Sequence, residues 1–339
     1  MHRTIVALLL CCVASAAAAA PTTTPRIVAA ANAFVATLDA GQRSTVQFAQ
    51  GDTAQKQRWS NLPGGVFQRA GLRWADMNEA QRNAWLAVMQ VTLSSAGYDR
   101  VLAEWRADDA LAARGAGGGR SPQFGMGFYY ISLIGAPSLT EPWQWQWGGH
   151  HVTINATIVG PNLVLTPSFI GVEPASYKDA SGNDVRPLGD IERDGFALVN
   201  WLDAEQQRAA ILGDAAIEVL LGPGADGRKA PVEGLPAARM SADQRAALMR
   251  LIRHYTGIAN EEDGAARTAE VEKALDETYF AWRGPTTPGS PIYFRVTGPA
   301  LVIEYAAQGP GAGGGSRTPN HIHGIYRDPT NDYGSKLVR

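Results

Sequence analysis

Four of the six histidines of this 339-residue chain fall in two short clusters. His150 and His151 follow two glycines in WQWGGHH, and His321 and His323 alternate with isoleucine in HIHGIYR. Both clusters lie in runs rich in β-branched and aromatic residues, which favour strands. Because imidazole is the commonest side-chain ligand of metal ions, the two clusters together predict a metal site.

The alternation of side chains along a strand limits how these histidines can meet. His321 and His323 project from the same face of a strand, whereas His150 and His151, as neighbours, would project from opposite faces. We therefore expect one of the adjacent pair to join His321 and His323, and the other to hydrogen-bond a ligand or act as an acid or base. A set of three imidazoles suits zinc first and copper second. The alternative is that these histidines are buried hydrogen-bonding residues that hold strand pairs together.

The first twenty residues have the pattern of a secretory signal peptide. MHRTIVALLLCCVASAAAAA joins a basic start to a short apolar run and a tract of small residues. Both cysteines, Cys11 and Cys12, lie in this segment. After its removal, residues 21–339 would contain only imidazole and carboxylate groups as strong ligands for a transition metal. We predict a secreted or periplasmic protein with a single α+β domain over 21–339.

Charged residues near the second histidine cluster are candidates for the catalytic groups. Glu304 lies on the strand just before the HIH segment, so it could reach the same face as a fourth ligand or general base. Asp328 follows the last strand, where it could serve the site or form the turn in RDPTND. Arg327 could clamp an anionic substrate group or form an ion pair.

Three tryptophans precede the first histidine cluster. Trp143, Trp145 and Trp147 alternate with glutamines, so on a strand they would share one face. Packing in the core is one interpretation of this surface. The other is a stacking wall beside the metal for an aromatic, sugar or peptide substrate.

Charge and composition restrict the partners. The formal net charge is −2 and the sequence has no basic tract, so no nucleic-acid partner is expected. The chain beyond the signal contains no apolar run long enough to span a bilayer, so we expect no membrane insertion after signal removal. A small molecule or a polymer of unidentified class is the expected substrate.

Hydrophobic periodicity divides the chain into helical and extended segments. Helices are predicted over 25–39, from a capping box at Asp76 and Glu79 to Gly97, and over 98–113, 189–213, 242–257 and 262–282. Strands are predicted over 128–135, 150–159, 163–172, 291–298, 301–306 and 321–327. These elements predict an α+β fold in which about six antiparallel strands, from 127–172 and 291–327, pack against helices from the N-terminal third and from 189–282. We find no repeat period.

Several longer motifs resemble a known family. They are RWSNLP, FYYISLIGAPS, WQWGGHH, TPSFIGVEPA, FAWRG, YFRVTGPALVIEY and HIHGIYRDPTNDYG. With these motifs the chain resembles, over nearly all of residues 21–339, a bacterial family of secreted proteins known as domain of unknown function number 3500. The resemblance implies membership of that family and implies no activity.

The sequence thus favours a metal-dependent enzyme with a histidine-rich site. Hydrolysis by a metal-activated water is the first expectation, because zinc held by imidazole and carboxylate needs no other cofactor. A copper or iron oxidoreductase is the alternative within enzymes. A metal carrier, or an envelope protein with structural histidines, is the alternative outside them.

Overall fold

The computed structural model describes residues 23–115, 122–308 and 319–338. The predicted signal peptide, residues 1–20, lies outside these described residues. Within them, no helix combines the length and apolarity that crossing a membrane requires.

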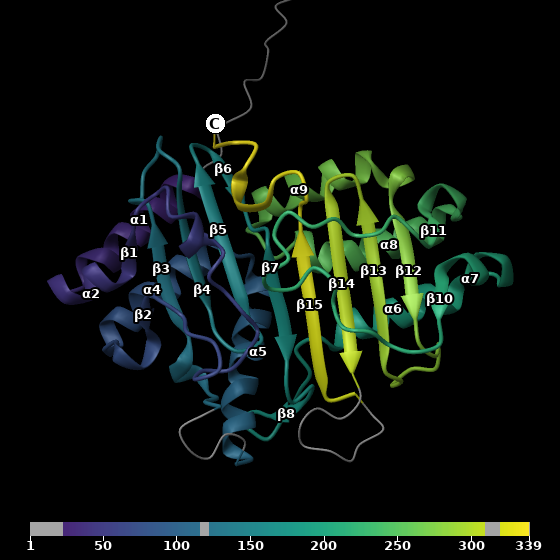
Figure 1. Ribbon diagram of the computed structural model, residues 1–339, viewed down its shortest axis with the longest axis horizontal. Helices are drawn as coiled ribbons and strands as arrows, with labels where there is room; N and C mark the ends of the chain where they lie inside the picture. The colour runs from purple at the N-terminus through teal and green to yellow at the C-terminus, as the bar shows by residue number, and fades with distance from the viewer. Residues whose placement is uncertain (1–22, 116–121, 309–318, 339) are drawn as a thin grey trace, which may run out of the picture.

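One large sheet runs through the molecule (Figure 1). Its main path is β1 (Gln47–Phe48), β3 (Tyr130–Ile134), β4 (Trp143–Gly148), β5 (Thr153–Val159), β7 (Ser168–Val172), β15 (His321–Arg327), β14 (Leu301–Gln308), β13 (Ile292–Gly298), β12 (Tyr279–Arg283) and β10 (Ile211–Gly213). Three short strands pair beside this path: β2 (Leu72–Arg73), β6 (Asn162–Val164) and β11 (Leu235–Pro236). A separate hairpin joins β8 (Tyr177–Lys178) to β9 (Asp184–Val185).

The α+β class is confirmed, and the sheet is larger and less regular than predicted. It has 13 strands among the described residues, where about six were expected, and it is mixed. The two edge pairs, β1 with β3 and β10 with β12, are parallel. These edge strands have two or three residues each, too few for the alternation that marks a strand in a sequence.

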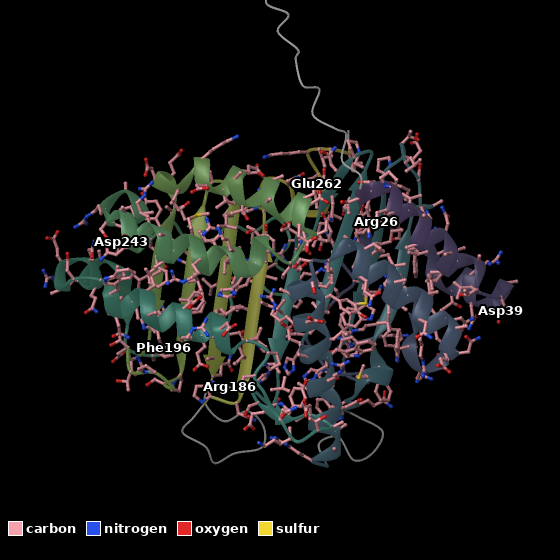
Figure 2. The ribbon with its side chains drawn as sticks, turned by 180° about the vertical axis from the view of Figure 1, so that it is seen from behind. Arg26, Asp39, Arg186, Phe196, Asp243 and Glu262 are labelled. Carbon is pink, nitrogen blue, oxygen red and sulfur yellow. The ribbon has the colours of Figure 1, made fainter. Side chains whose placement is uncertain are left out.

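Helices cover one face of the sheet (Figure 2). They are α1 (Thr23–Ala36), α2 (Ala40–Val46), α3 (Thr53–Lys56), α4 (Glu79–Thr92), α5 (Ser95–Ala113), α6 (Gly189–Trp201), α7 (Ala204–Ala210), α8 (Ala242–Thr256) and α9 (Glu261–Lys273), of which the long ones form the layer. Single 3-10 turns occupy Trp74–Asp76, Met126–Phe128, Ala237–Arg239, Leu275–Glu277 and Asp332–Gly334.

Predicted helix boundaries are wrong in several places. The single helix predicted over 189–213 is two helices, α6 and α7, followed by the strand β10. Two other boundaries also differ. The capping box before α4 uses Asn78 and Gln81, not Asp76 and Glu79, and that helix ends at Thr92, before Gly97. The helix predicted over 262–282 ends at Lys273, and the aromatic run that follows it forms β12. In both places the helical spacing of apolar residues continues in the sequence beyond the end of the helix. The residues that follow the helix pair with distant segments, so the local spacing could not show where the helix ends.

The two faces of the sheet differ in chemistry. On the helix face, Trp145 contacts Trp85 and Trp147 contacts Trp105, with ring centroids 5.5 and 5.0 Å apart. On the other face, β4 presents Gln146, whose side-chain amide donates to Asn155 of β5. The opposite face is therefore polar although it is buried, and each polar group needs a partner.

Two long loops supply those partners. The first, residues 49–71, joins β1 to β2, and the second, residues 214–234, joins β10 to β11. Gln55 of the first loop donates to Gln146 of the sheet. In the second, the backbone N–H groups of Leu220 and Leu221 donate to the carboxylate of Glu304. The loops thus replace a second layer of helices.

The N-terminal and C-terminal halves repeat one arrangement, contrary to the expectation of no repeat. The order α1, α2, β1, long loop, β2, 3-10 turn, α4, α5, β3, β4, β5, β7 matches α6, α7, β10, long loop, β11, 3-10 turn, α8, α9, β12, β13, β14, β15. Capping boxes occur at the same places, at Asn78 and Ser241 for example. The order of strands reads the same from either edge, and β7 and β15 pair antiparallel at the centre.

The repeat extends to the pairing register and to side chains. Gly148 pairs with Thr153 across the turn from β4 to β5, as Thr297 pairs with Val302 across the turn from β13 to β14. A reciprocal pair of side-chain amides joins Gln42 to Gln81 in one half, and an equivalent pair joins Gln206 to Gln244 in the other. The unit is far longer than the 20–50 residues of the common repeat classes, and only scattered positions keep their residue types.

Candidate metal centre

His321 and His323 lie on the loop-covered face at the start of β15. Their ring centroids are 4.4 Å apart, as the alternation of the strand predicted. His323 pairs across the sheet with Ala306 on one side and Gly171 on the other, so small neighbours flank it. A Cβ at Gly171 would lie 3.1 Å from the carbonyl oxygen of His151, which shows how closely the two clusters approach.

His150 and His151 do not lie on a strand, so the predicted divergence of their side chains is wrong. They occupy the turn between β4, which ends at Gly148, and β5, which begins at Thr153. His151 has a positive φ of 67°, a conformation that costs a residue with a Cβ about 1 kcal/mol or more. Their ring centroids are 3.6 Å apart. Only His151 reaches the second cluster, so the predicted group of three plus one is nevertheless present.

Three imidazoles converge. One nitrogen from each of His151, His321 and His323 lies within 4.8 Å of the others, and the Nε2 atoms of His151 and His321 are 2.7 Å apart. In a tetrahedral zinc site with bonds of 2.0–2.1 Å, ligand nitrogens stand roughly 3.3 Å apart. These two rings would need to separate by roughly 0.6 Å, a small side-chain movement, to hold such an ion.

The environment keeps two of these rings in the form that binds metal. Burial, together with the neighbouring His150, His321 and His323, holds the pKa of His151 well below its usual range. Burial, then the nearby His323 and His150, lowers the pKa of His321 to about 3. Both rings are therefore neutral at neutral pH, as metal ligation requires.

His323 is held from both sides by the two long loops. Its Nδ1 lies 2.9 Å from the carboxylate of Glu218, and its Nε2 lies 3.2 Å from the side-chain amide of Asn61. Burial alone would raise the pKa of Glu218, but the hydrogen bond and charge of His323 outweigh it and lower that pKa. A carboxylate that accepts from Nδ1–H leaves Nε2 as the metal-binding atom, an arrangement common among metal-bound histidines. The amide of Asn61, which now donates to Nε2, would have to move aside for a metal to bind there.

His150 makes a separate pair with a carboxylate. Its Nδ1 lies 2.6 Å from Oδ1 of Asp108, on α5, and both side chains are buried. His150 therefore links the turn to the helix layer, while His151 links the same turn to β15. Asp108, His150 and His151 form a second group whose candidate ligand atoms all lie within 4.8 Å.

Two further contacts position the histidine turn. The guanidinium of Arg69 donates to the carbonyl of Gly149 and to the carbonyls of Ser60 and Leu62, which flank Asn61. The hydroxyl of Tyr129 donates to the carbonyl of His150. A Cβ at Gly149 would lie 2.5 Å from the Tyr129 ring, so only glycine fits at that position.

Glu173 is the remaining carboxylate at the cluster. Glu173 directly follows β7, whose last residue, Val172, pairs with Ile322 between the two histidines of β15. Burial raises the pKa of Glu173, and the charges of His150 and His323 oppose that rise. Two acidic side chains therefore flank the histidines: Glu173, which follows β7, and Glu218 of the second long loop.

The charged residues predicted for the site lie away from the imidazoles. Glu304 shares the face of His323, but its carboxylate accepts from the N–H groups of Leu220 and Leu221 and from the hydroxyl of Tyr293. These bonds anchor the second long loop. Glu304 is thus not brought to the histidines as a ligand or base. Its partner in the sheet is Ile325, two residues further along β15 than His323.

Arg327 and Asp328 stand at the far end of β15. Arg327 is buried, donates to Asp226 at 3.0 Å and Asp332 at 2.8 Å, and lies over the ring of Trp59. Asp328 accepts from Thr330, the turn interaction that its sequence suggested, and pairs with Arg267 at 3.2 Å. Neither is free to meet a substrate at the histidines.

The three tryptophans share one face of β4, as predicted, but they form the core. Trp143, Trp145 and Trp147 are at most 1% exposed and face the helices. A stacking wall for substrate is therefore not what this surface provides. The alternation predicted correctly that the three tryptophans share a face, but it could not predict that helices cover that face.

Sequence reasoning missed the groups that complete the cluster: Asp108, Glu218, Asn61 and Arg69. Asp108 lies on a helix of the N-terminal third, and the other three lie in the two long loops. No short-range spacing relates them to the histidines, so only the fold reveals them.

The comparisons with known proteins identify a family and no activity. A comparison with curated proteins gives no match, and a comparison with solved structures gives none. The family model described as a protein of unknown function (DUF3500) matches residues 20–335, which include every residue of the candidate metal centre. The chain therefore belongs to the DUF3500 family of proteins of unknown function.

Proposed function

We propose that this protein is a metal-dependent hydrolase that binds its metal through His151, His321 and His323. The observation that carries the proposal is the convergence of three imidazoles from two distant segments, of which His151 and His321 are held neutral. Zinc is the first choice, since three imidazoles leave a position open for water or substrate. A metal ion in this position would supply a Lewis acid that makes bound water acidic.

The pair of His150 and Asp108 supports hydrolysis over simple metal storage. A metal carrier needs only the ligands of the ion. His150 is a further buried imidazole beside those ligands, and the carboxylate of Asp108 orients it. In that arrangement Asp108 accepts from Nδ1–H, so Nε2 of His150 is left to accept a proton. A base adjacent to a metal ligand is the group that activation of a water molecule requires.

The C-terminal half argues against a purely structural role for the histidines. Its turn from β13 to β14 has the same length and register as the histidine turn, and Pro299 and Ala300 stand where His150 and His151 stand in the other half. That turn also lacks a residue with positive φ. The fold can therefore make this turn without histidine and without the strained backbone of His151.

Elemental analysis of protein purified without chelators tests the proposal. We expect one zinc per chain, lost in the double variant His321→Ala/His323→Ala, and hydrolysis of p-nitrophenyl acetate that depends on the zinc. His150→Gln should keep the zinc and lower the hydrolysis rate by about 100-fold or more. His254→Gln is the matched control, because His254 also pairs with an aspartate, Asp194 at 2.8 Å, but on α8. Wild-type protein that stays free of metal when zinc is added would overturn the proposal.

A copper oxidoreductase is the second candidate. It is favoured by the donor set, because all three candidate ligands are imidazoles and the nearby carboxylates bond to histidines instead. Copper outcompetes zinc at most nitrogen sites in a test tube, so added metals cannot decide between them. The metal found in protein isolated from its own cells decides, and copper with an electron paramagnetic resonance signal of nitrogen ligation would favour the oxidoreductase.

We also propose that the protein acts outside the cytoplasm, in the periplasm or after secretion. The composition of residues 1–20 supports this, with a basic start, an apolar run and a tract of small residues. Intact mass of the protein from the extracytoplasmic fraction should correspond to a chain that begins near residue 21. Protein that retains residues 1–20 and stays in the cytoplasm would contradict it.

A further inference from the structure

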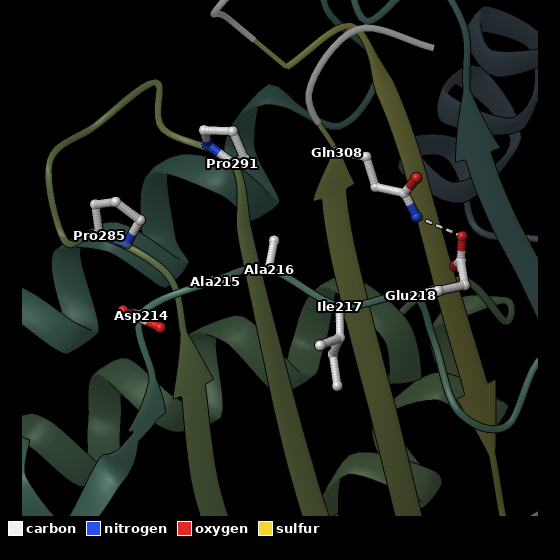
Figure 3. A pocket seen from close by; sticks show the side chains of 8 residues that line it. All are labelled: Asp214, Ala215, Ala216, Ile217, Glu218, Pro285, Pro291 and Gln308. Carbon is white, nitrogen blue, oxygen red and sulfur yellow. Dashed lines mark hydrogen bonds between the residues drawn. The ribbon is translucent and has the colours of Figure 1, made fainter. Parts of the chain in front are cut away.

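A cleft of about 640 Å³ opens next to the candidate metal centre on the loop-covered face (Figure 3). Residues 214–218 form one wall, and Pro285, Pro291 and Gln308 form the other. The volume lies within the roughly 300–1,000 Å³ of known ligand sites.

The cleft joins the metal centre through one hydrogen-bonded pair. Glu218 closes one end and accepts both from the side-chain amide of Gln308 and from Nδ1 of His323. Gln308 is in turn the cross-strand neighbour of His321. A molecule in the cleft would therefore be separated from His321 and His323 at that end only by the side chains of Glu218 and Gln308.

The other end lies across the sheet. Asp214 stands near Pro285, which follows β12, while Glu218 stands beside β15 (Figure 3). Those strands are separated by β13 and β14, so the cleft crosses three strand spacings, roughly 14 Å. An extended chain of about four residues, at roughly 3.3 Å each, has this length.

The lining indicates which chemistry would fit. Between the two ends it is made of Ala215, Ala216, Ile217 and prolines, a narrow apolar wall. Among the described residues, the charged side chains in the lining are Asp214 and Glu218, both acidic, so anionic substrates are disfavoured. Within residues 23–115, 122–308 and 319–338, the lining has no aromatic ring, on which sugars stack, and few of the polar groups that a sugar would need.

We infer that the cleft binds a short peptide with small apolar side chains and a positive charge at the end far from the metal. The inference rests on the proposed hydrolase function, since it identifies the substrate class of that site. The apolar middle of the peptide would contact Ala216 and Ile217, and its distal cation would meet Asp214.

Fluorescence anisotropy with dansyl-Ala-Ile-Ala-Lys-amide, against zinc-loaded protein, tests the inference. We expect binding, weakened about twofold to fivefold when glutamate replaces the lysine, as for an exposed ion pair. Asp214→Asn should remove that difference. Ala216→Trp should weaken binding at least tenfold by filling the cleft. Ala40→Trp, at an exposed position of α2, is the matched control and should bind as wild type does.

The outcomes separate this inference from the proposed function. Zinc content, measured on the same samples, reports the metal centre alone. Zinc present with equal peptide binding by the Ala216→Trp and Ala40→Trp variants would overturn the cleft and leave the metal centre standing. Equal binding of the lysine and glutamate peptides would overturn the charge preference. Displacement of the peptide by hexylamine, as readily as by unlabelled peptide, would overturn the peptide class.

Discussion

The two halves of this protein share one order of helices, loop and strands, which we call the frame, and they differ in the residues at equivalent positions of it. Each half builds two pairs of helices, a long loop and six strands in the same order, and the halves meet where β7 pairs with β15. Yet the four clustered histidines converge at one place only. In the N-terminal half they occupy the turn from β4 to β5, and in the C-terminal half the first residues of β15.

The difference is instructive because the equivalent positions are occupied by ordinary residues. Pro299 and Ala300 form the turn that matches His150 and His151. By the pairing register, Asn162 and Val164 of β6 match His321 and His323, and there the chain turns aside into β6 rather than lengthening β7. The frame therefore does not need the histidines. Both long loops nevertheless converge on His323, since Asn61 comes from one loop and Glu218 from the other.

The largest expected effect tests whether the halves have equivalent cores. Trp145 and Phe294 are each the third residue of their strand, and both are fully buried. Trp145→Ala and Phe294→Ala should each lower the free energy of unfolding by about 3–5 kcal/mol, through lost burial and a residual cavity. Urea denaturation measures both. A cost confined to one variant would show that only one half needs its core.

The second prediction concerns a buried acid, Glu104, whose equivalent position in the other half holds an exposed glutamate. Glu104 of α5 is 1% exposed, and burial raises its pKa to about 8 despite Arg100 at 3.5 Å. The unfolded chain releases this proton near its ordinary pKa of 4.5, while the folded chain keeps it. The stability from this group is thus complete below pH 4.5 and is lost as the pH rises to 8, by up to about 1 kcal/mol per unit.

A matched pair of variants checks this sign. Glu104→Gln should remove a decrease in the free energy of unfolding between pH 5 and 8 that wild type shows. Glu270→Gln is the control, because Glu270 stands at the same distance from its helix N-cap and is exposed. Urea midpoints across this pH range give the comparison. Parallel profiles for wild type and Glu104→Gln would mean that Glu104 is ionised in the folded protein.

The third prediction replaces the histidines of the turn from β4 to β5. His150→Pro/His151→Ala gives the N-terminal half the residues of the equivalent turn. Zinc affinity should fall at least about 100-fold, measured by competition with a chromophoric chelator, since a ligand and its neighbour are lost. The free energy of unfolding should fall by about 2–4 kcal/mol, because buried Asp108 loses its partner while the strain at His151 is removed. An unfolded variant would show that the histidines are part of the frame.

The smallest effect concerns the amide pairs that repeat in both halves. Gln81→Ala and Gln244→Ala each remove a capping-box side chain and its bond to Gln42 or Gln206. Each should lower the free energy of unfolding by about 1–2 kcal/mol. Thermal unfolding of the two variants measures this. A large difference between them would show that one half is the more stable unit.

Much of the secondary structure followed from local patterns, whereas the repeat did not. The strands near 292–298, 301–308 and 321–327 were predicted from apolar runs and turn residues. The edge strands β1 and β10 were not, because two or three residues carry no period and form strands only through a partner. The repeat itself is preserved in capping boxes and pairing registers, and the capping signals are too short to be distinctive without a fold.

Motifs and alternation along one strand were enough to predict the family, the α+β class and the fact that His321 and His323 share a face. Only the tertiary structure decided which of the adjacent histidines joins them, because a turn with positive φ does not follow strand geometry. It also decided that Asp108 and Glu218, and not Glu304, support the imidazoles. Those contacts join residues a hundred or more positions apart, or a helix to a turn, and no local pattern encodes such distances.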